Sequence, residues 1–246
     1  EQMGYVTTTQ KSENELVTQA DPQCQRIIIQ RIREVYPDHG FIAEEGEQGK
    51  LFKRPPTGKP TIWWAIDPID GTHNFAHGIP IFAVSIAALY EGEPILGVIF
   101  HPSTDAMFTA VKGGEAQLDG RRIAAGEQEI GSLTSVGIDS HFEGPLPTWL
   151  CDLIRRSRFR NFGTTALHLA YIARGGLVAG VFCTPKLWDI AAGVVIAEGA
   201  GAIVTDWAGG KIFPVDLDTY DGGAFRIVAA NRSAHPRLLE TMRDRA

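Results

Sequence analysis

The amino-acid sequence predicts a mixed fold, with an α+β first half and an α/β second half. Residues 82–118 contain apolar runs separated only by short turns, which is typical of antiparallel strands in a meander. From about residue 132, strand-like runs alternate with stretches of helical periodicity instead. The chain has 246 residues, 44% of them hydrophobic, which suffices for a large core. We therefore expect residues 1–130 and 131–246 to form two tightly packed halves of one functional unit.

The first half is expected to begin with a helix. Asp21 followed by Pro22 resembles an N-cap with proline at the first helical position, and apolar residues then recur on one face until Pro37 ends the helix. The polar stretch 44–59, rich in Gly and Pro, predicts a loop. The continuous apolar run 61–66 predicts a strand that is buried on both faces.

The remaining elements follow from the same two periodicities. Strands are expected at 82–90, 95–100, 106–111, 116–118, 135–138, 177–182, 202–205 and 226–229. Helices are expected at 146–156, 164–174, 190–198 and at the C-terminal end.

The charge of the chain excludes some classes of partner. It has 23 Lys and Arg against 29 Asp and Glu, a net charge of −6, so it has no general attraction to nucleic acid or to an anionic membrane. No apolar run approaches the roughly 18 residues of a membrane span, and a signal peptide is not evident. Three widely spaced cysteines are typical of thiols in a reducing compartment. We expect a cytoplasmic protein that binds neither nucleic acid nor membrane.

The segment 67–72, Asp-Pro-Ile-Asp-Gly-Thr, carries the strongest chemical signal. Asp67 follows a buried strand directly, and the mouth of a sheet is where ligands of α/β folds collect. Pro68 stiffens the turn, Gly71 allows close backbone approach, and Thr72 can begin a helix whose free N–H groups bind an anion. These features predict a metal–phosphate site. The alternative is a tight turn in which Asp70 serves only as a helix cap.

Other acidic residues of the chain could combine with this segment to form one site. Taken alone, Glu44 and Glu45 would be solvated in their loop, and Asp189 would be a helix N-cap. Together with the two aspartates of segment 67–72 they form a set of oxygen ligands from separate parts of the chain, as a hard cation such as Mg²⁺ requires. His73 and His77 have the spacing of a zinc helix, but no glutamate lies between them, so a structural role is favoured.

Three segments of the chain resemble the signature segments of the inositol monophosphatase family, which comprises Mg²⁺-dependent, lithium-sensitive phosphatases. They are Phe-Ile-Ala-Glu-Glu at 41–45, Trp-Ala-Ile-Asp-Pro-Ile-Asp-Gly-Thr-His-Asn-Phe at 64–75 and Trp-Asp-Ile-Ala-Ala-Gly at 188–193. Leu-Val-Thr-Gln-Ala-Asp at 16–21 and Phe-Gly-Thr-Thr-Ala-Leu at 162–167 also resemble the family, in the family's order. The resemblance implies an α+β fold of the inositol monophosphatase and fructose-1,6-bisphosphatase type, a layered αβαβα sandwich.

The resemblance also implies a role for each site residue. Two or three Mg²⁺ ions would be bound by the side chains of Glu44, Asp67, Asp70 and Asp189 and by the carbonyl of Ile69, with Asp67 bridging two ions. Glu45 would be an acid of the outer shell.

The same resemblance implies how the substrate is held and attacked. The implied phosphate and substrate contacts are Gly71, Thr72, Gly163, Thr164, Thr165 and Asp189. Thr72, paired with Asp21, would orient and help to activate a water near Glu44. For Asp21 the alternative is a role as the cap of its own helix.

Two departures from the family pattern affect the substrate. Members that recognise sugars place an acid just before the Trp-Asp pair, whereas residues 175–188 contain none, and Lys186 there could meet an anionic group or lie in solvent. Only 15 residues precede Leu16, so the family's first helix is expected to be missing or shortened.

The expected activity is Mg²⁺-dependent hydrolysis of a small phosphomonoester, with inositol monophosphate or a related polyol phosphate favoured. Histidinol phosphate, fructose 1,6-bisphosphate and a 3′-phosphoadenosine nucleotide are the other substrates considered, and the resemblance implies a homodimer. A non-catalytic scaffold of the same fold would be expected to lack a metal carboxylate or Thr72, and all are present. A glycoside hydrolase using Glu44 and Asp67 would leave the Asp-Gly-Thr turn without a role.

Overall fold

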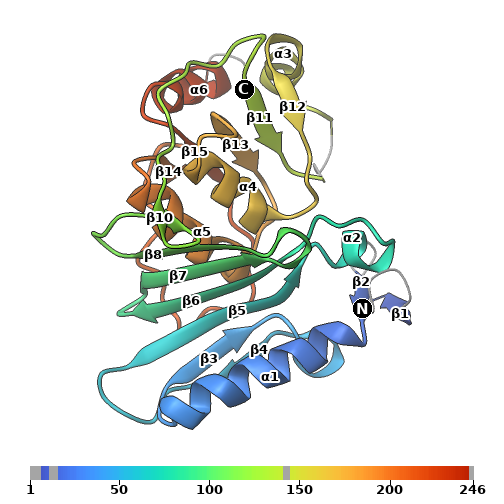
Figure 1. Cartoon of the computed structure of the whole chain (residues 1–246), viewed down its shortest axis with the longest axis vertical. Coiled ribbons are helices and arrows are strands. Elements are labelled where there is room, and N and C mark those ends of the chain that lie inside the picture. Colours follow the sequence, from blue (N-terminus) through green and yellow to red (C-terminus); the bar gives the residue numbers. More distant parts are fainter. Residues whose placement is uncertain (1–6, 11–15, 141–144, 244–246) are drawn as a thin grey trace.

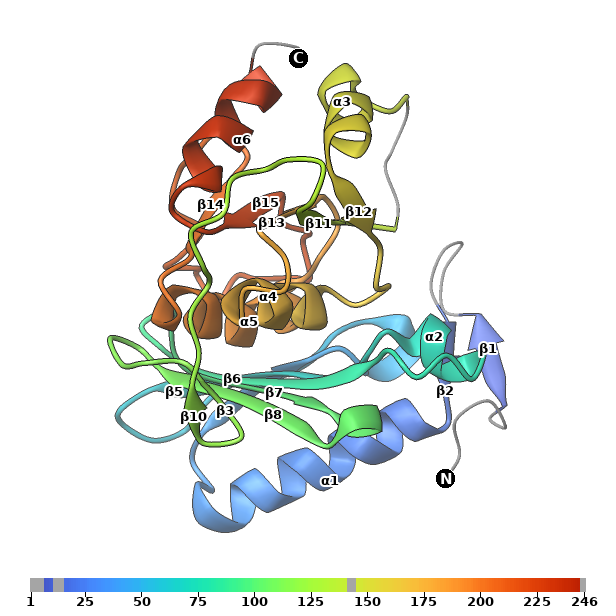
Figure 2. The same ribbon diagram turned by 45° about the horizontal axis from the view of Figure 1, so that its top comes forward.

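The computed structural model describes residues 7–10, 16–140 and 145–243. Its elements form five layers, seen edge-on in Figure 2. Helix α1 (Ala20–Val35) covers one face of a large sheet, and α4 (Thr165–Ala173) and α5 (Leu187–Gly199) lie on the other. A small sheet follows, covered by α3 (Thr148–Arg156) and α6 (Ala234–Arg243). This order of layers confirms the predicted αβαβα sandwich.

The large sheet contains eight strands in the order β10-β9-β8-β7-β6-β5-β3-β4 (Figure 1). The strands are β3 (Gly40–Ala43), β4 (Phe52–Arg54), β5 (Ile62–Asp70), β6 (Ala83–Tyr90), β7 (Glu93–His101), β8 (Ala106–Val111), β9 (Gln117–Leu118) and β10 (Arg121–Arg122). Only β3 and β5 pair in parallel, and the other pairs are antiparallel, which confirms the meander.

The small sheet has five strands in the order β12-β11-β13-β15-β14. They are β11 (Ser135–Ile138), β12 (Arg158–Arg160), β13 (Ala179–Phe182), β14 (Ile203–Asp206) and β15 (Ile227–Ala230). β11 runs parallel to both of its neighbours, so the residues that follow β11 and β13 meet at one edge of the sheet. The short elements are a hairpin of β1 (Thr8–Gln10) and β2 (Leu16–Thr18), helix α2 (Thr72–Ala76), and the 3-10 turns η1 (Glu47–Gly49) and η2 (Pro102–Thr104).

The middle layer explains the composition of α4 and α5. Both helices lie between two sheets, so their residues are buried almost all round and are almost all apolar. α5 approaches the large sheet so closely that a Cβ atom at Gly97 would lie 2.4 Å from the carbonyl oxygen of Ala192. Glycine at this position of β7 therefore lets the helix pack directly on the strand.

Several boundaries differ from the prediction. α1 begins at Ala20, not after a cap at Asp21, because the Asp21 side chain turns back to bond Thr18 and Thr72. The predicted loop 44–59 contains η1 and β4, since β4 gains its order by pairing with β3 at the sheet edge. α5 begins at Leu187, three residues earlier than predicted.

The predicted strand 61–66 extends further, as β5, to Asp70. A register shift between Asp67 and Asp70 in its pairing with β6 lets the strand continue through Pro68.

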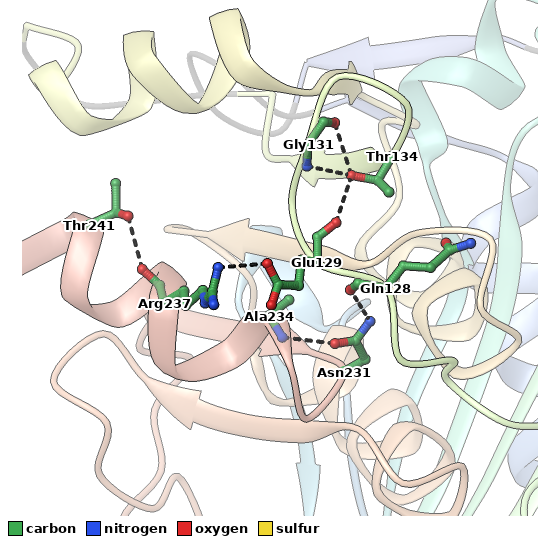
Figure 3. A network of polar contacts seen from close by, with 8 residues as sticks. All are labelled: Gln128, Glu129, Gly131, Thr134, Asn231, Ala234, Arg237 and Thr241. Atoms are coloured by element: carbon green, nitrogen blue, oxygen red, sulfur yellow. Dashed lines mark hydrogen bonds and ion pairs between the residues drawn. The ribbon is translucent and has the colours of Figure 1, made fainter.

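The segment between the two sheets is held against the C-terminal helix, as Figure 3 shows. Asn231 Nδ2 donates to the carbonyl of Gln128 at 2.8 Å, and Arg237 Nη1 lies 2.6 Å from Glu129 Oε2. The Thr134 hydroxyl lies within 3.2 Å of the carbonyl of Glu129. These contacts fix the path of the chain as it passes from the large sheet to β11.

No helix among the described residues is both long enough and apolar enough to cross a membrane.

Candidate active site

A pocket of about 840 Å³ lies where β5 ends and where α4 and α5 begin. It collects most of the residues that the sequence singled out: Glu44, Asp67, Ile69, Asp70, Gly71, Thr72, Gly163, Thr164, Thr165 and Asp189 all line it. Asp21 lies behind the pocket wall, in contact with Thr72. Glu45 faces another surface, where its main chain exchanges two hydrogen bonds with Gln25.

The carboxylates of the pocket raise one another's pKa. Burial raises the pKa of Asp67 well above its usual value, and the charges of Glu44 and Asp70 raise it further. Burial likewise raises the pKa of Asp189, with the charges of Asp70 and Glu44 adding to the rise. The side chains of Asp67 and Asp189 also interact directly, and this interaction raises the pKa of Asp67 and lowers that of Asp189.

Asp70 joins the two sheets. Its Oδ2 accepts hydrogen bonds from the Thr164 hydroxyl at 2.5 Å and from the Ala166 amide at 2.6 Å, both at the start of α4. Burial raises the pKa of Asp70 to about 6, although these bonds act to lower it. A carboxylate of the large sheet therefore caps a helix of the second half.

Asp189 is held at the start of α5. It is the third residue of the helix, and its Oδ2 accepts from the amide of Lys186 at 2.7 Å, while the Asp189 amide donates to the Lys186 carbonyl. Lys186 is therefore the N-cap residue, and the alternative role of Asp189 as the N-cap was wrong, because its side chain bonds back to the cap from within the first turn.

Thr72 and Asp21 are brought together from residues 51 positions apart. The Thr72 hydroxyl lies 2.9 Å from Asp21 Oδ1 and 3.0 Å from the carbonyl of Ile69. Asp21 is fully buried, and its Oδ2 accepts from the Thr18 amide at 2.9 Å and from the Thr18 hydroxyl. This anchoring leaves Oδ1 directed at Thr72.

Gly71 and Gly163 lie where the turns that precede α2 and α4 contact each other. Gly71 has φ +98°, and a Cβ atom there would lie 3.2 Å from the carbonyl of Gly163. Gly163 has φ +67° and packs against Asn74, whose Nδ2 donates to the carbonyls of Phe162 and Ile81 at 2.6 and 2.7 Å. Because neither glycine can carry a side chain here, the two turns approach backbone to backbone.

The pocket also contains residues that the sequence motifs missed. Asp139 follows β11 and lines the pocket, as do Lys53 and Tyr220. An acid directly after a strand is the signal that drew attention to Asp67, and it could have identified Asp139 as well. Lys53 was missed because the segment 44–59 was predicted to be a loop, whereas Lys53 lies in β4. Its Nζ donates to the carbonyls of Asp218 and Tyr220 and so holds the segment that forms one wall.

The donor set fits a hard divalent cation. Four carboxylates and a carbonyl line one pocket and supply only oxygen ligands, as Mg²⁺ prefers. Within the described part of the chain, no three His, Cys, Asp or Glu side chains already stand in an arrangement that could hold an ion. The aspartate oxygens instead accept from nearby donors, such as the Ile69 amide at Asp67 and the Lys186 amide at Asp189.

Comparisons with known proteins agree with this fold. The whole chain, residues 1–246, matches the model of the inositol monophosphatase family. The inositol-1-monophosphatase of Mesorhizobium japonicum is 33% identical over 239 residues, which cover 95% of this chain and 85% of the relative. The Nus factor SuhB of Vibrio cholerae is 38% identical over 215 residues, covering 83% of this chain and 77% of the relative.

Solved structures show the same fold. An inositol monophosphatase of Thermotoga maritima superposes with a TM-score of 0.83 at 30% identity, covering 99% of this chain and 90% of the other. The fold is therefore that of the inositol monophosphatases. The chain belongs to the inositol monophosphatase family.

Proposed function

We propose that this protein is a Mg²⁺-dependent phosphatase that hydrolyses a small phosphomonoester. The observation that carries the proposal is the convergence of Glu44, Asp67, Asp70 and Asp189 with the Thr72–Asp21 pair around one pocket. Acidic side chains in such number repel a phosphate unless cations lie between them, and a hydroxyl held by a buried carboxylate suits the activation of water.

The four carboxylates and the Ile69 carbonyl would hold the metal. When bound, Mg²⁺ lowers the pKa of attached water and stabilises the charge that develops on the phosphoryl and leaving oxygens. The charges of Glu44, Asp70 and Asp189 all act on Asp67, so Asp67 is the residue best placed to serve more than one ion.

The residues of the chain then have distinct tasks in the hydrolysis. Thr72 accepts the proton of the attacking water at Oγ1 as its own proton passes to Asp21 Oδ1. A bond forms between the water oxygen and phosphorus, and the bond from phosphorus to the alcohol oxygen breaks. The alcohol oxygen takes up a proton from solvent water as it leaves, and Asp21 returns its proton through Thr72 to solvent, which restores the pair. The main-chain amides of Gly71 and Thr72, at the turn where α2 begins, contact the phosphate.

The alcohol part is proposed to be inositol or a related polyol. The relative from Mesorhizobium japonicum is named for inositol 1-monophosphate, which supports this choice. Other relatives are named Nus factor SuhB, a name that describes no phosphatase substrate, so a role of the folded chain apart from hydrolysis is the second candidate. The two differ in whether turnover occurs.

Phosphate release from a panel of phosphomonoesters tests the proposal. The panel contains inositol 1-phosphate, histidinol phosphate, fructose 1,6-bisphosphate and 3′-phosphoadenosine 5′-phosphate, each with Mg²⁺ and with EDTA. Release that requires Mg²⁺ is the expected result. A folded protein that releases no phosphate from any ester would favour the second candidate.

The variant Asp189→Asn gives a sharper test. We expect it to lower kcat at least about 100-fold, because an amide binds a hard cation less strongly than a carboxylate does. Asp119→Asn is the matched control: Asp119 accepts from the Met107 amide at 2.8 Å in an exposed turn outside the pocket. Full Mg²⁺-dependent turnover by Asp189→Asn would refute the assignment of this ligand.

A further inference from the structure

Beyond the candidate metal and phosphate contacts, the pocket is lined by an acid from an unexpected element. Residues 175–188 hold no Asp or Glu, yet the turn 183–186 before α5 lines the pocket beside Asp189. Asp139, which follows β11, faces this turn from the neighbouring strand, since β11 and β13 run in parallel and end at the same edge. Asp139 thus supplies the acidic side chain that the segment 175–188 lacks, although it comes from a different strand.

Asp139 is held firmly in place. Its Oδ2 accepts from the amides of Cys183 and Thr184 at 3.1 and 3.2 Å and from the Thr184 hydroxyl at 3.1 Å. Its Oδ1 accepts from the amide of Ser140 at 3.1 Å. The carboxylate is half-buried, so it is both anchored to the turn and open to the pocket.

The hydrogen bonds leave a specific capacity for a ligand. A carboxylate offers about four acceptor sites, two on each oxygen. Among the residues that the structure describes, three donors share the two sites of Asp139 Oδ2, whereas one donor occupies Oδ1, so Oδ1 can accept one more. Thr184 directs its only hydroxyl proton at Asp139, so its oxygen can only accept from a ligand.

Two acceptors side by side select for donors. Hydroxyl or ammonium groups of an alcohol would satisfy both, whereas a second phosphate would meet a negative charge and an oxygen with no free proton. Lys186 is the one cation of the turn 183–186, and it lies two residues beyond Thr184. Lys50 and Lys53 also line the pocket, so a preference for a bisphosphate would have to depend on one of these three lysines.

We propose that Asp139 is a specificity-determining residue, which with Thr184 selects phosphomonoesters whose alcohol carries hydroxyl or ammonium donors over esters with a second phosphate. The proposal rests on the proposed function and names the substrate class of the same pocket. The positions of Asp139 and Thr184 do not depend on the metal ligands, so the two ends of the pocket can be tested separately.

Equilibrium binding of the products tests the alcohol end without turnover. Titration calorimetry with Mg²⁺ would measure inorganic phosphate alone, and then inositol or histidinol in the presence of phosphate, for the wild type and for Asp139→Asn. We expect the variant to bind the alcohol about 10-fold more weakly, since hydrogen bonds to a charged group are worth about 1.5–3 kcal/mol. Its affinity for phosphate should stay within about twofold.

Steady-state kinetics supply the second measurement. For Asp139→Asn we expect KM for inositol 1-phosphate to rise about 10-fold with kcat within about threefold, and Thr184→Val to shift KM in the same direction. The values of kcat/KM for fructose 1,6-bisphosphate and 3′-phosphoadenosine 5′-phosphate should rise or stay unchanged. Asp206→Asn is the control, because Asp206 holds a turn outside the pocket by accepting from the amides of Ala208 and Gly210 at 2.8 and 2.7 Å.

The outcomes separate this proposal from the proposed function. Alcohol that binds in an Asp139-dependent way to a protein without turnover would refute the phosphatase and support the specificity residue. Unchanged alcohol affinity in Asp139→Asn, equal losses for alcohol and phosphate, or no binding of either alcohol to the wild type would each overturn the role of Asp139. So would a bisphosphate preference that Lys186→Ala abolishes.

Discussion

At the scale of single residues, the structure explains why a threonine follows the Asp-Gly pair. The hydroxyl of Thr72 is held by Asp21 Oδ1, and Asp21 is itself fixed by Thr18. A buried carboxylate that is bonded on one oxygen and directed at a hydroxyl with the other is a proton acceptor with a defined position. Asp21 therefore serves two elements at once: Oδ2 holds the chain at the start of α1 through Thr18, and Oδ1 holds Thr72.

Replacing Thr72 by Val keeps the shape of the side chain and removes the hydroxyl. We expect kcat to fall about 10²–10⁴-fold, the usual contribution of a positioned proton acceptor. Thr72→Ser restores the hydroxyl and should stay within about 10-fold of the wild type. The measurement is initial rates at saturating substrate and Mg²⁺. A Thr72→Val enzyme with wild-type kcat would exclude the Thr72–Asp21 pair from the proton transfer.

At the scale of elements, the start of α4 links the two sheets. Thr164 caps the helix by accepting from the Leu167 amide at 3.2 Å. Its hydroxyl also donates a hydrogen bond to Asp70 Oδ2 at the end of β5. The helix is thus oriented by a carboxylate from the other half of the chain. This contact fixes the distance between the candidate metal ligands and the turn 162–164.

Thr164→Val tests this link through stability. The variant loses a cap, worth about 1 kcal/mol, and leaves a buried carboxylate with one donor fewer. We expect the free energy of unfolding to fall by about 2–3 kcal/mol, whereas Thr164→Ser should lose less than about 1 kcal/mol. Urea unfolding in EDTA measures the difference without a contribution from metal. Equal stability of the two variants would mean that the hydroxyl does not connect the halves.

At the scale of the whole molecule, the layers were more predictable than the contacts between them. The strand at Ala106–Val111 agrees with its prediction to the residue, because apolar periodicity is a local signal. β4 was missed because it is short and polar and becomes a strand only by pairing with β3. Asp70 was identified as a site residue, but its capping of α4 joins residues 94 positions apart, and no local pattern encodes that.

The acidic pocket also affects the stability of the entire fold. Asp70, with a folded pKa of about 6, binds a proton more readily than in the unfolded chain, so its contribution to stability is lost as pH rises through about 6. Asp67 and Asp189 act in the same direction. Buried His168 opposes them: burial lowers its pKa to about 4, so its contribution is lost as pH falls. A pH profile of the protein alone therefore combines both effects.

Mg²⁺ separates the two contributions, because it acts on the carboxylates and not on His168. At pH 7.5 fewer protons compete for the carboxylates than at pH 5, so a cation should raise Tm by several degrees relative to EDTA. At pH 5 protons compete for the same oxygens, and the rise should be smaller. Calorimetric scans at both pH values, with Mg²⁺ and with EDTA, measure this difference. Asp189→Asn should lose most of the rise at pH 7.5, while Asp119→Asn keeps it. An equal rise at both pH values, or one that survives in Asp189→Asn, would place the cation outside the pocket that the two halves of the chain enclose.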